Sequence, residues 1–340
     1  MSKTVLLTGA TGYIGSWICR YLLESGYTVR ASVRNKSNSA RYAHLETMAQ
    51  GLPGTLEFWE ADLLKPGSYD AAAQGSDYVF HVASPFLLKY KDAQKELIDP
   101  ALEGTRNVLE AATRSGTVQR VVLTSSVASI YGDNRDMQAQ GLGTFNETHW
   151  NTTSSLTHQQ YSYSKTLAER AAWEIATNQQ QWSLVTINPS FVFGPPIGDA
   201  SDSGSMDFLK QFLSGKYFGA APLIRFGFVD VREVAMAHLR AAELPHASGR
   251  YILSNIVLST LEIGKLLGQN GGNRMVMPFL KAPKKLIAPV APLFGVSKAF
   301  VLHNADYPLA FDNSRSIREL GIQYRDFKET LREMVARVKA

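Results

Sequence analysis

Along the first two hundred residues, segments with the hydrophobic period of a strand alternate with segments that have the period of a helix. Short apolar or alternating runs, typical of strands in a sheet, cover residues 5–7, 27–33, 56–61, 78–83, 118–124 and 183–194. Between them, apolar residues recur at helical spacing, most clearly after residue 12, over 96–115 and from 161 onward. The buried side of the helix over 96–115 is predicted to contain Leu97, Ala101, Val108, Leu109 and Ala112. This alternation predicts an α/β fold with a parallel, doubly wound sheet.

The periodic pattern weakens beyond residue 195. Helical pieces are predicted over residues 206–213, 231–244, 261–267 and 327–338, with a strand at 251–253. We expect a core over residues 1–194. Residues 195–340 should form a smaller mixed part that roofs the strand ends, with some segments returning to the core. Residues 131–160 have no clear period, and loops of that length inside a compact domain are usually functional or disordered.

Composition and charge exclude several classes of protein. The chain has 340 residues, of which 45% are hydrophobic and 19% charged, as in globular proteins. The net charge is +5, but the Lys and Arg residues are scattered, so we expect no nucleic-acid partner. No apolar run approaches the ~18 residues of a membrane span. We recognise no signal peptide at the N-terminus, and there is one cysteine; a cytoplasmic setting is the expectation.

Three glycines follow the first strand at once. Gly9, Gly12 and Gly15 lie in TGATGYIG, between the apolar run and the first helical pattern. Glycines at such a turn let the backbone approach a pyrophosphate, while the helix N-terminus attracts its negative charge. Glycines also punctuate ordinary turns, so it is the position between strand and helix that favours a dinucleotide site.

The second strand ends in a cation. An acidic residue ~20 residues beyond the glycine turn would bind the ribose 2′-hydroxyl of NAD. Arg34 stands there instead, and Arg41 follows at the start of the next helical pattern. Two cations suit a 2′-phosphate, whereas the alternative is a solvated strand end. We favour the phosphate, because the expected carboxylate is missing.

Two polar residues at strand positions have less certain roles. Asp62 follows the third strand, where it would either bind an adenine amino group or cap the next turn. His81 lies inside the fourth run, and we interpret it as a core histidine whose ring is hydrogen-bonded. No cluster of Cys, His or Glu accompanies it, so the sequence predicts no metal site.

Tyr161 and Lys165 open the helix that follows the long loop. They are four residues apart and therefore lie on one helical face, one turn from each other. A nearby ammonium favours the phenolate and lowers a phenol pKa from its usual value near 10. The pair is thus suited to general acid catalysis, with a serine hydroxyl holding the substrate oxygen. The alternative is a surface tyrosine and lysine on an ordinary helix.

Taken together, these motifs resemble the extended short-chain dehydrogenase/reductase superfamily. TGATGYIG, the strand-end TSS at 124–126 and YSYSK at 161–165 have its order and spacing, and FVDV at 228–231 is similar to a later motif. Within the superfamily, the chain is most similar to the group of dihydroflavonol reductases, cinnamoyl-CoA reductases and microbial aldehyde/ketone reductases. The segments that resemble this group are GYTVRASVRN, FWEADL, VFHVASP, VVLTSS, YSYSKTLAERAAWE and SGRYILS.

The resemblance implies an NADP-dependent oxidoreductase with a Rossmann core over residues 1–194 and a mainly substrate-binding part over 195–340. Hydride would pass from NADPH to a ketone or aldehyde carbon of a small molecule while Tyr161 protonates the oxygen. Lys165 would lower the pKa of Tyr161 and bind the nicotinamide ribose. Ser126, rather than Ser125, would orient the carbonyl.

The resemblance also implies the binding residues. The cofactor would be bound by Gly9, Gly12, Tyr13, Ile14, Gly15, Arg34, Arg41, Asp62, Leu63, Ala83, Lys165, Pro189 and Val192. Substrate contacts are expected from Ser84, Phe86, Tyr131 and Phe228.

Two departures from the family pattern bear on function. Plant dihydroflavonol reductases have an asparagine five positions after the catalytic serine, where this chain has Tyr131, which argues against a dedicated flavonoid substrate. Many extended members have an asparagine that supports a proton relay, where this chain has Ala101.

Several alternatives stay open at this point. A dihydroflavonol-type or hydroxysteroid oxidoreductase is one, and an NAD-dependent sugar-nucleotide epimerase or dehydratase is another. Arg34 counts against the last, because epimerases tend to have an acidic residue at that strand end. A catalytically silent protein on the same fold is a third, although the Ser126, Tyr161 and Lys165 set is intact. The chain is expected to be a monomer or a homodimer.

Overall fold

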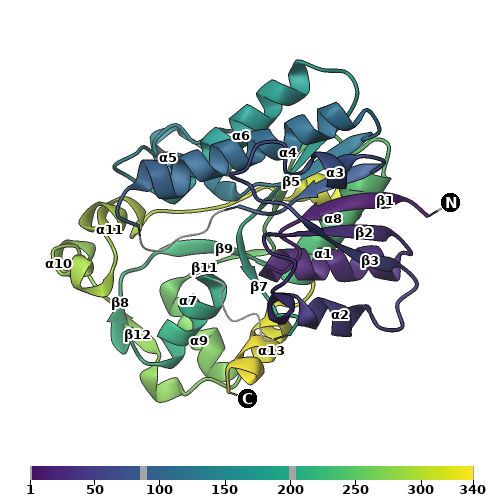
Figure 1. The fold of residues 1–340 in the computed structure, drawn as a ribbon. Coiled ribbons are helices and arrows are strands. Elements are labelled where there is room, and N and C mark those ends of the chain that lie inside the picture. The colour runs from purple at the N-terminus through teal and green to yellow at the C-terminus, as the bar shows by residue number, and fades with distance from the viewer. Residues whose placement is uncertain (1, 85–89, 199–203, 340) are drawn as a thin grey trace.

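The computed structural model describes residues 2–84, 90–198 and 204–339 and is built on a seven-stranded parallel sheet (Figure 1). Its strands are β1 (Thr4–Thr8), β2 (Thr28–Val33), β3 (Thr55–Glu60), β4 (Tyr78–His81), β5 (Arg120–Thr124), β6 (Ser183–Pro189) and β10 (Gly249–Leu253). Their order is β10-β6-β5-β4-β1-β2-β3. The order reverses between β1 and β4, and ligands of such sheets bind beyond the strand carboxyl ends at this point. The predicted doubly wound sheet is confirmed.

Helices cover both faces of this sheet, because successive strand side chains point to opposite sides. Leu6, Val79 and Val121 pack against one helical layer, whereas Val5 and Phe80 pack against the other. The first layer contains α3 (Asp70–Ala73), α4 (Asp99–Ser115) and α6 (Gln160–Thr177). The second contains α1 (Tyr13–Glu24), α2 (Ala43–Ala49), α8 (Val231–Glu243) and α12 (Ser314–Leu320). In Figure 1, α4 and α6 lie above the sheet and α1 below it.

The remaining elements form two small sheets and their helices. β11 (Ile256–Ser259), β9 (Arg225–Asp230) and β7 (Phe191–Phe193) pair in that order, and β12 (Pro278–Lys281) pairs with β8 (Gly219–Ala221). The helices of this part are α7 (Gly204–Leu213), α9 (Thr260–Gln269), α10 (Lys284–Ile287), α11 (Lys298–Asn304) and α13 (Phe327–Lys339). The long loop contains α5 (Arg135–Ala139). Short helical turns are η1 (Ser39–Arg41), η2 (Gln94–Ile98), η3 (Val127–Ser129), η4 (Arg274–Val276) and η5 (Ala291–Phe294).

The predicted strand over residues 183–194 is two strands. β6 stays in the large sheet, and after Ser190 the chain turns into β7, which pairs with β9. β7 thus pairs in a small sheet although it lies within the range 1–194 expected for the core. β10, α8 and α12, all after residue 195, belong to the large sheet and to the helices that cover it.

The predicted helix over 96–115 is α4, preceded by the wider turn η2, and all five residues expected on its buried side are buried. Within the described ranges, no helix combines the length and apolarity needed to cross a bilayer.

Candidate active site

The turn between β1 and α1 is so tightly packed that it has no room for side chains at Gly9 and Gly15. Gly9 has φ +70°, and the amide of Gly12 donates to its carbonyl at 3.0 Å. A Cβ on Gly15 would lie 2.0 Å from the Gly9 oxygen, and one on Gly9 would lie 2.8 Å from the amide nitrogen of Ala83. α1 begins at Tyr13, and Gly12 as its N-cap has no side chain to cap it, so the N-terminus of the helix is available to an anion.

Tyr13 and Ile14, the first residues of α1, face the interior. The hydroxyl of Tyr13 donates to the Gly194 carbonyl at 2.6 Å, which ties the glycine turn to the end of β7. Burial raises the pKa of Tyr13 well above its usual value. Ile14 is partly buried against the core beneath α1.

Arg34 and Arg41 are both exposed, beyond the end of β2 and in η1. Asp62 follows β3, and its Oδ1 accepts from the Leu64 amide at 2.9 Å, so the turn-capping alternative is observed for this residue. Leu63 packs against Gly104, where an added Cβ would come within 3.1 Å of the leucine Cβ.

Ser126 lies just beyond β5, beside Tyr161. Its Oγ accepts from the Ala128 amide at 3.1 Å as the N-cap of η3, and its side chain also hydrogen-bonds to Tyr161. Ser125 is buried and hydrogen-bonds instead to Glu169, away from this pair. The structure thus brings Ser126, and not Ser125, to the tyrosine.

Tyr161 and Lys165 lie in the first turns of α6. Lys165 is buried, its Nζ lies 6.0 Å from the Tyr161 ring centroid, and burial lowers its pKa to about 8 although Glu169 acts in the opposite direction. Burial raises the pKa of Tyr161 to about 12, and the Ser126 hydrogen bond acts in the opposite direction. The net shift is therefore upward and not downward as the sequence suggested, because the effect of burial is the larger one.

A buried ion pair connects this part of α6 to β10. Arg250 Nε donates to Glu169 Oε1 at 2.6 Å, and both side chains are almost fully buried. Glu169 also accepts from Ser125, Ser129 and, at 2.8 Å, Asn188 Nδ2. These bonds hold the carboxylate ionised and lower its pKa despite burial. The network connects α6, β6, β10 and the segment that contains Ser126.

Sequence reasoning missed Glu169 and Arg250. The spacing of Lys165 and Glu169, one helical turn apart, was a readable signal. The position of Arg250, 81 residues from Glu169 at the start of a strand, was not.

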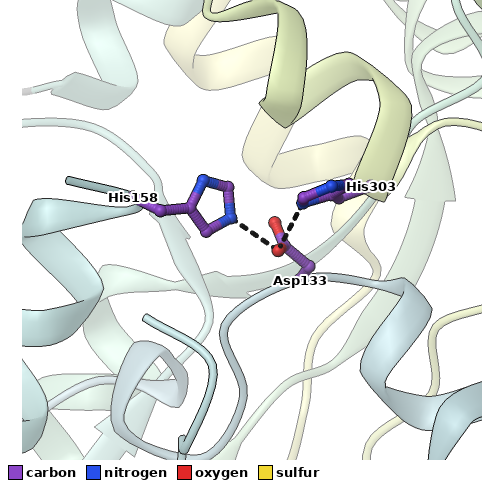
Figure 2. A group of neighbouring side chains, drawn as sticks. All are labelled: Asp133, His158 and His303. Carbon is purple, nitrogen blue, oxygen red and sulfur yellow. Dashed lines mark hydrogen bonds and ion pairs between the residues drawn. The ribbon is translucent and has the colours of Figure 1, made fainter. Parts of the chain in front are cut away.

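The structure also brings Asp133, His158 and His303 into contact, although they are far apart in the sequence. His158 Nε2 and His303 Nδ1 lie 2.6 and 3.2 Å from Asp133 Oδ2, across 25 and 170 residues of sequence (Figure 2). The sequence predicts no metal site because no cluster of Cys, His or Glu accompanies His81, and a cluster assembled from distant segments is invisible to that argument. The ligand atoms of these three residues all lie within 4.8 Å of one another.

The expected substrate residues have different surroundings. Ser84 is half-buried and lines a cavity of about 10 Å³ that Lys165 also lines. Tyr131 stacks on Phe145, with ring centroids 5.2 Å apart. Phe228 is fully buried among aromatic rings of the second part, so the expectation that it contacts substrate is wrong. Phe86 lies outside the described residues.

Three further residues singled out in the sequence lie in β6, β7 and β4. Pro189 ends β6, and Val192 is buried in β7. His81 is buried in β4 with its Nδ1 2.9 Å from Thr8 Oγ1, and burial lowers its pKa to about 3. The interpretation of His81 as a hydrogen-bonded core residue is confirmed.

A model of the NAD dependent epimerase/dehydratase family matches residues 5–256. The chain belongs to this family. Among its relatives, cinnamoyl-CoA reductase CAD2 of Medicago truncatula is 35% identical over 344 residues, covering 100% of this chain and 96% of that protein. Tetraketide alpha-pyrone reductase 2 of Arabidopsis thaliana is 40% identical over 268 residues, 77% of this chain and 81% of that protein.

A solved structure of a related reductase shares the whole fold of this epimerase/dehydratase family member. Yeast methylglyoxal/isovaleraldehyde reductase Gre2, complexed with NADPH, has 26% identity and a TM-score of 0.78, with 98% of both chains covered. These comparisons confirm the family and the doubly wound fold expected from the motifs. They place the chain among the reductases of the extended short-chain type, which are oxidoreductases.

Proposed function

We propose that this chain is an NADPH-dependent reductase of ketones or aldehydes in which Tyr161 is the general acid. The observation that carries the proposal is the hydrogen bond between Ser126 and Tyr161 beside the buried Lys165 ammonium. The relatives described above, each named as a reductase, support the same class of reaction.

The glycine turn and the two arginines fit this cofactor. The turn has no room for side chains at Gly9 and Gly15, and the uncapped N-terminus of α1 suits a pyrophosphate. Arg34 and Arg41 are exposed beyond β2, where a 2′-phosphate would distinguish NADPH from NADH. The same positions argue against an epimerase, which would have an acidic residue there.

The three side chains divide the work on the substrate. A bound NADPH supplies the hydride. A carbonyl oxygen that accepts from Ser126 and Tyr161 is polarised, and the charge that develops on it is met by the tyrosine proton. With its pKa raised to about 12 by burial, Tyr161 is protonated at neutral pH and has that proton to give. Lys165, whose pKa burial lowers to about 8, is still mainly charged at pH 7 and stabilises the phenolate left behind.

The substrate range we propose is aldehydes and ketones in general rather than one flavonoid. Tyr131 stands at the position expected to read flavonoid hydroxyls, and its ring packs against Phe145 and Phe311. An aromatic ring in that place offers apolar surface instead of an amide.

The test is NADPH oxidation by the purified chain with aromatic and aliphatic aldehydes, keto esters and a dihydroflavonol. We expect turnover on simple carbonyls and a loss of at least about 100-fold in Tyr161→Phe, the usual size of a general-acid contribution. Tyr163→Phe, on the same helix, is the matched control and should keep wild-type turnover. Equal turnover of both variants, each folded, would reject the assignment of the acid.

The cofactor assignment has its own test. Arg34→Ala should raise the KM for NADPH and leave the KM for NADH nearly unchanged, because only NADPH has the 2′-phosphate. Arg106→Ala, at an exposed ion pair on α4, is the control. An unchanged preference between the two nucleotides in Arg34→Ala would remove the role of this residue.

A further inference from the structure

Asp133, His158 and His303 form a compact group outside the catalytic residues, which we call the DHH cluster. Asp133 precedes α5, His158 precedes α6 and His303 lies on α11, so the cluster joins the segment before the catalytic helix to the C-terminal part (Figures 1 and 2). Both imidazoles point a ring nitrogen at the same carboxylate oxygen, Asp133 Oδ2 (Figure 2).

The donor set is that of a transition-metal site. Two imidazole nitrogens and one carboxylate oxygen suit Zn²⁺ and related divalent ions, whereas Mg²⁺ and Ca²⁺ prefer oxygen ligands alone. Ligands held at ~2.0–2.1 Å on a tetrahedral ion lie roughly 3.4 Å apart. His303 Nδ1 is already 3.2 Å from Asp133 Oδ2, and His158 Nε2, at 2.6 Å, would have to move outward by under about 1 Å to accept an ion.

The second oxygen of the carboxylate is fixed by amide donors. Asn304 Nδ2 donates to Asp133 Oδ1 at 2.7 Å, and Gln159 Nε2 donates to it at 3.2 Å. Such bonds orient a carboxylate so that its other oxygen is presented to an ion. Gln159 has φ +55°, and Gln159 and Asp306 are the two non-glycine residues of the described ranges with positive φ. Backbone strain of this kind is stored at ligand sites more often than elsewhere.

The buried carboxylates in and beside the cluster accept hydrogen bonds but have no partner with a permanent positive charge among the described residues. Asp133 and Asp136 are both buried, and within the described ranges neither forms an ion pair with a lysine or arginine. Buried charges are ordinarily paired or coordinate a metal, so a divalent cation would supply a permanent positive charge that the two imidazoles supply only when protonated.

We propose that the DHH cluster binds one divalent transition-metal ion of the Zn²⁺ class through Asp133 Oδ2, His158 Nε2 and His303 Nδ1. Three protein ligands leave a fourth position for water or a small ligand. The ion would link α11 to the loop before α6 and hold the two segments together. The proposal is independent of the reductase activity, since it rests on residues outside the proposed cofactor and catalytic sets.

The test is titration of the chelator-treated full chain with Co²⁺, followed by the visible absorption of the bound ion, and then displacement by Zn²⁺. We expect one Co²⁺ per chain, and affinity reduced by at least about tenfold to a hundredfold in His158→Ala and in His303→Ala, as loss of even an outer partner does at metal sites. Zn²⁺ should also raise the melting temperature of the wild type and not of either variant. Both histidines are partly exposed, so we expect these variants to fold.

His246→Ala is the matched control, because His246 is exposed and outside the cluster, and it should bind Co²⁺ like the wild type. Wild-type affinity in both cluster variants would overturn the proposal, because the ion would then be held by surface histidines. A wild type that binds no Co²⁺ after chelator treatment would overturn it too, and the two imidazoles would then act only as hydrogen-bond partners of Asp133.

Discussion

Lys165 is an ionisable side chain that the fold keeps almost out of contact with water. It is 8% exposed, and burial lowers its pKa from 10.5 to about 8. Below pH 8 both the folded and the unfolded chain hold this proton, so the folded state bears the full cost of the buried charge. As the pH rises through 8 the folded state releases the proton first, and the cost disappears by about 10.5.

We therefore predict that Lys165→Met raises the free energy of unfolding at pH 7 by about 1–3 kcal/mol while it removes activity, because one pKa unit corresponds to about 1.4 kcal/mol. The gain should shrink above pH 8. Urea unfolding at pH 7 and at pH 9.5 measures both values. Lys328→Met, at an exposed position, should change neither. A Lys165→Met chain that is less stable than the wild type at pH 7 would show that the ammonium contributes favourable contacts instead.

The same group predicts the pH dependence of carbonyl reduction. Tyr161, with its pKa raised to about 12, stays protonated throughout the working range, whereas Lys165 loses its charge near pH 8. We expect kcat/KM for reduction to fall by roughly tenfold per pH unit above 8, since only the charged lysine stabilises the phenolate. Initial rates between pH 6 and 10, with a return to pH 7 to check stability, give the profile. A flat profile up to pH 10 would contradict this role for Lys165.

At the scale of elements, the turn between β1 and α1 depends on the absence of side chains. A Cβ at Gly15 would meet the Gly9 carbonyl oxygen at 2.0 Å and the Gly9 carbonyl carbon at 2.7 Å, and both of these atoms are backbone. We predict that Gly15→Ala destabilises the chain by about 1–3 kcal/mol or more and abolishes NADPH binding, because α1 must move away from β1. Thermal unfolding and fluorescence titration with NADPH measure the two effects.

Gly26→Ala is the control for that substitution. Gly26 has φ +80°, but nothing lies within 4 Å of its added Cβ, so strain alone should act and cofactor affinity should be kept. Equal cofactor affinity in Gly15→Ala and the wild type would contradict the steric argument.

The ion pair between α6 and β10 gives a second prediction for elements. We expect Arg250→Met to cost about 3–5 kcal/mol, because it leaves Glu169 charged and buried without its partner. Arg114→Met removes the pair with Asp70, in which both side chains are about half exposed, and should cost no more than about 1 kcal/mol. Urea unfolding of both variants decides the comparison. Equal costs would mean that water reaches the Glu169 network.

At the scale of the whole molecule, the two parts of the chain share one core. β10 pairs with β6, and α8 and α12 cover the same face as α1, although all three elements follow residue 195. We predict that a fragment of residues 1–194 does not fold, because it lacks a strand and two helices of its principal core. Circular dichroism on heating should show no cooperative transition, whereas the full chain unfolds in one. A fragment that melts cooperatively and binds NADPH would mean that residues 1–194 are an independent domain.

The strands and helices could be predicted from the sequence because their signals are local, and the spacing of the proposed catalytic pair is local as well. The glycine turn, the Tyr161 and Lys165 spacing and the run of strands depend on residues close together in the chain. Where the prediction failed, distant segments decided the outcome. Phe228 was expected at the substrate, but aromatic side chains from several segments enclose it. Lys165 was expected to lower the pKa of Tyr161, but burial by the assembled fold raises it.

The sequence by itself therefore determined the sheet, the position of the glycine turn after β1 and the placement of Tyr161 and Lys165 on one helix, since periodicity and short spacings specify them. Only the tertiary structure decided that Arg250 pairs with Glu169 beneath the proposed catalytic residues and that two histidines meet Asp133. The physical reason is that burial and charge pairing arise between segments as far apart as 170 residues. The pattern of neighbouring residues in the sequence does not show which distant segments will come into contact.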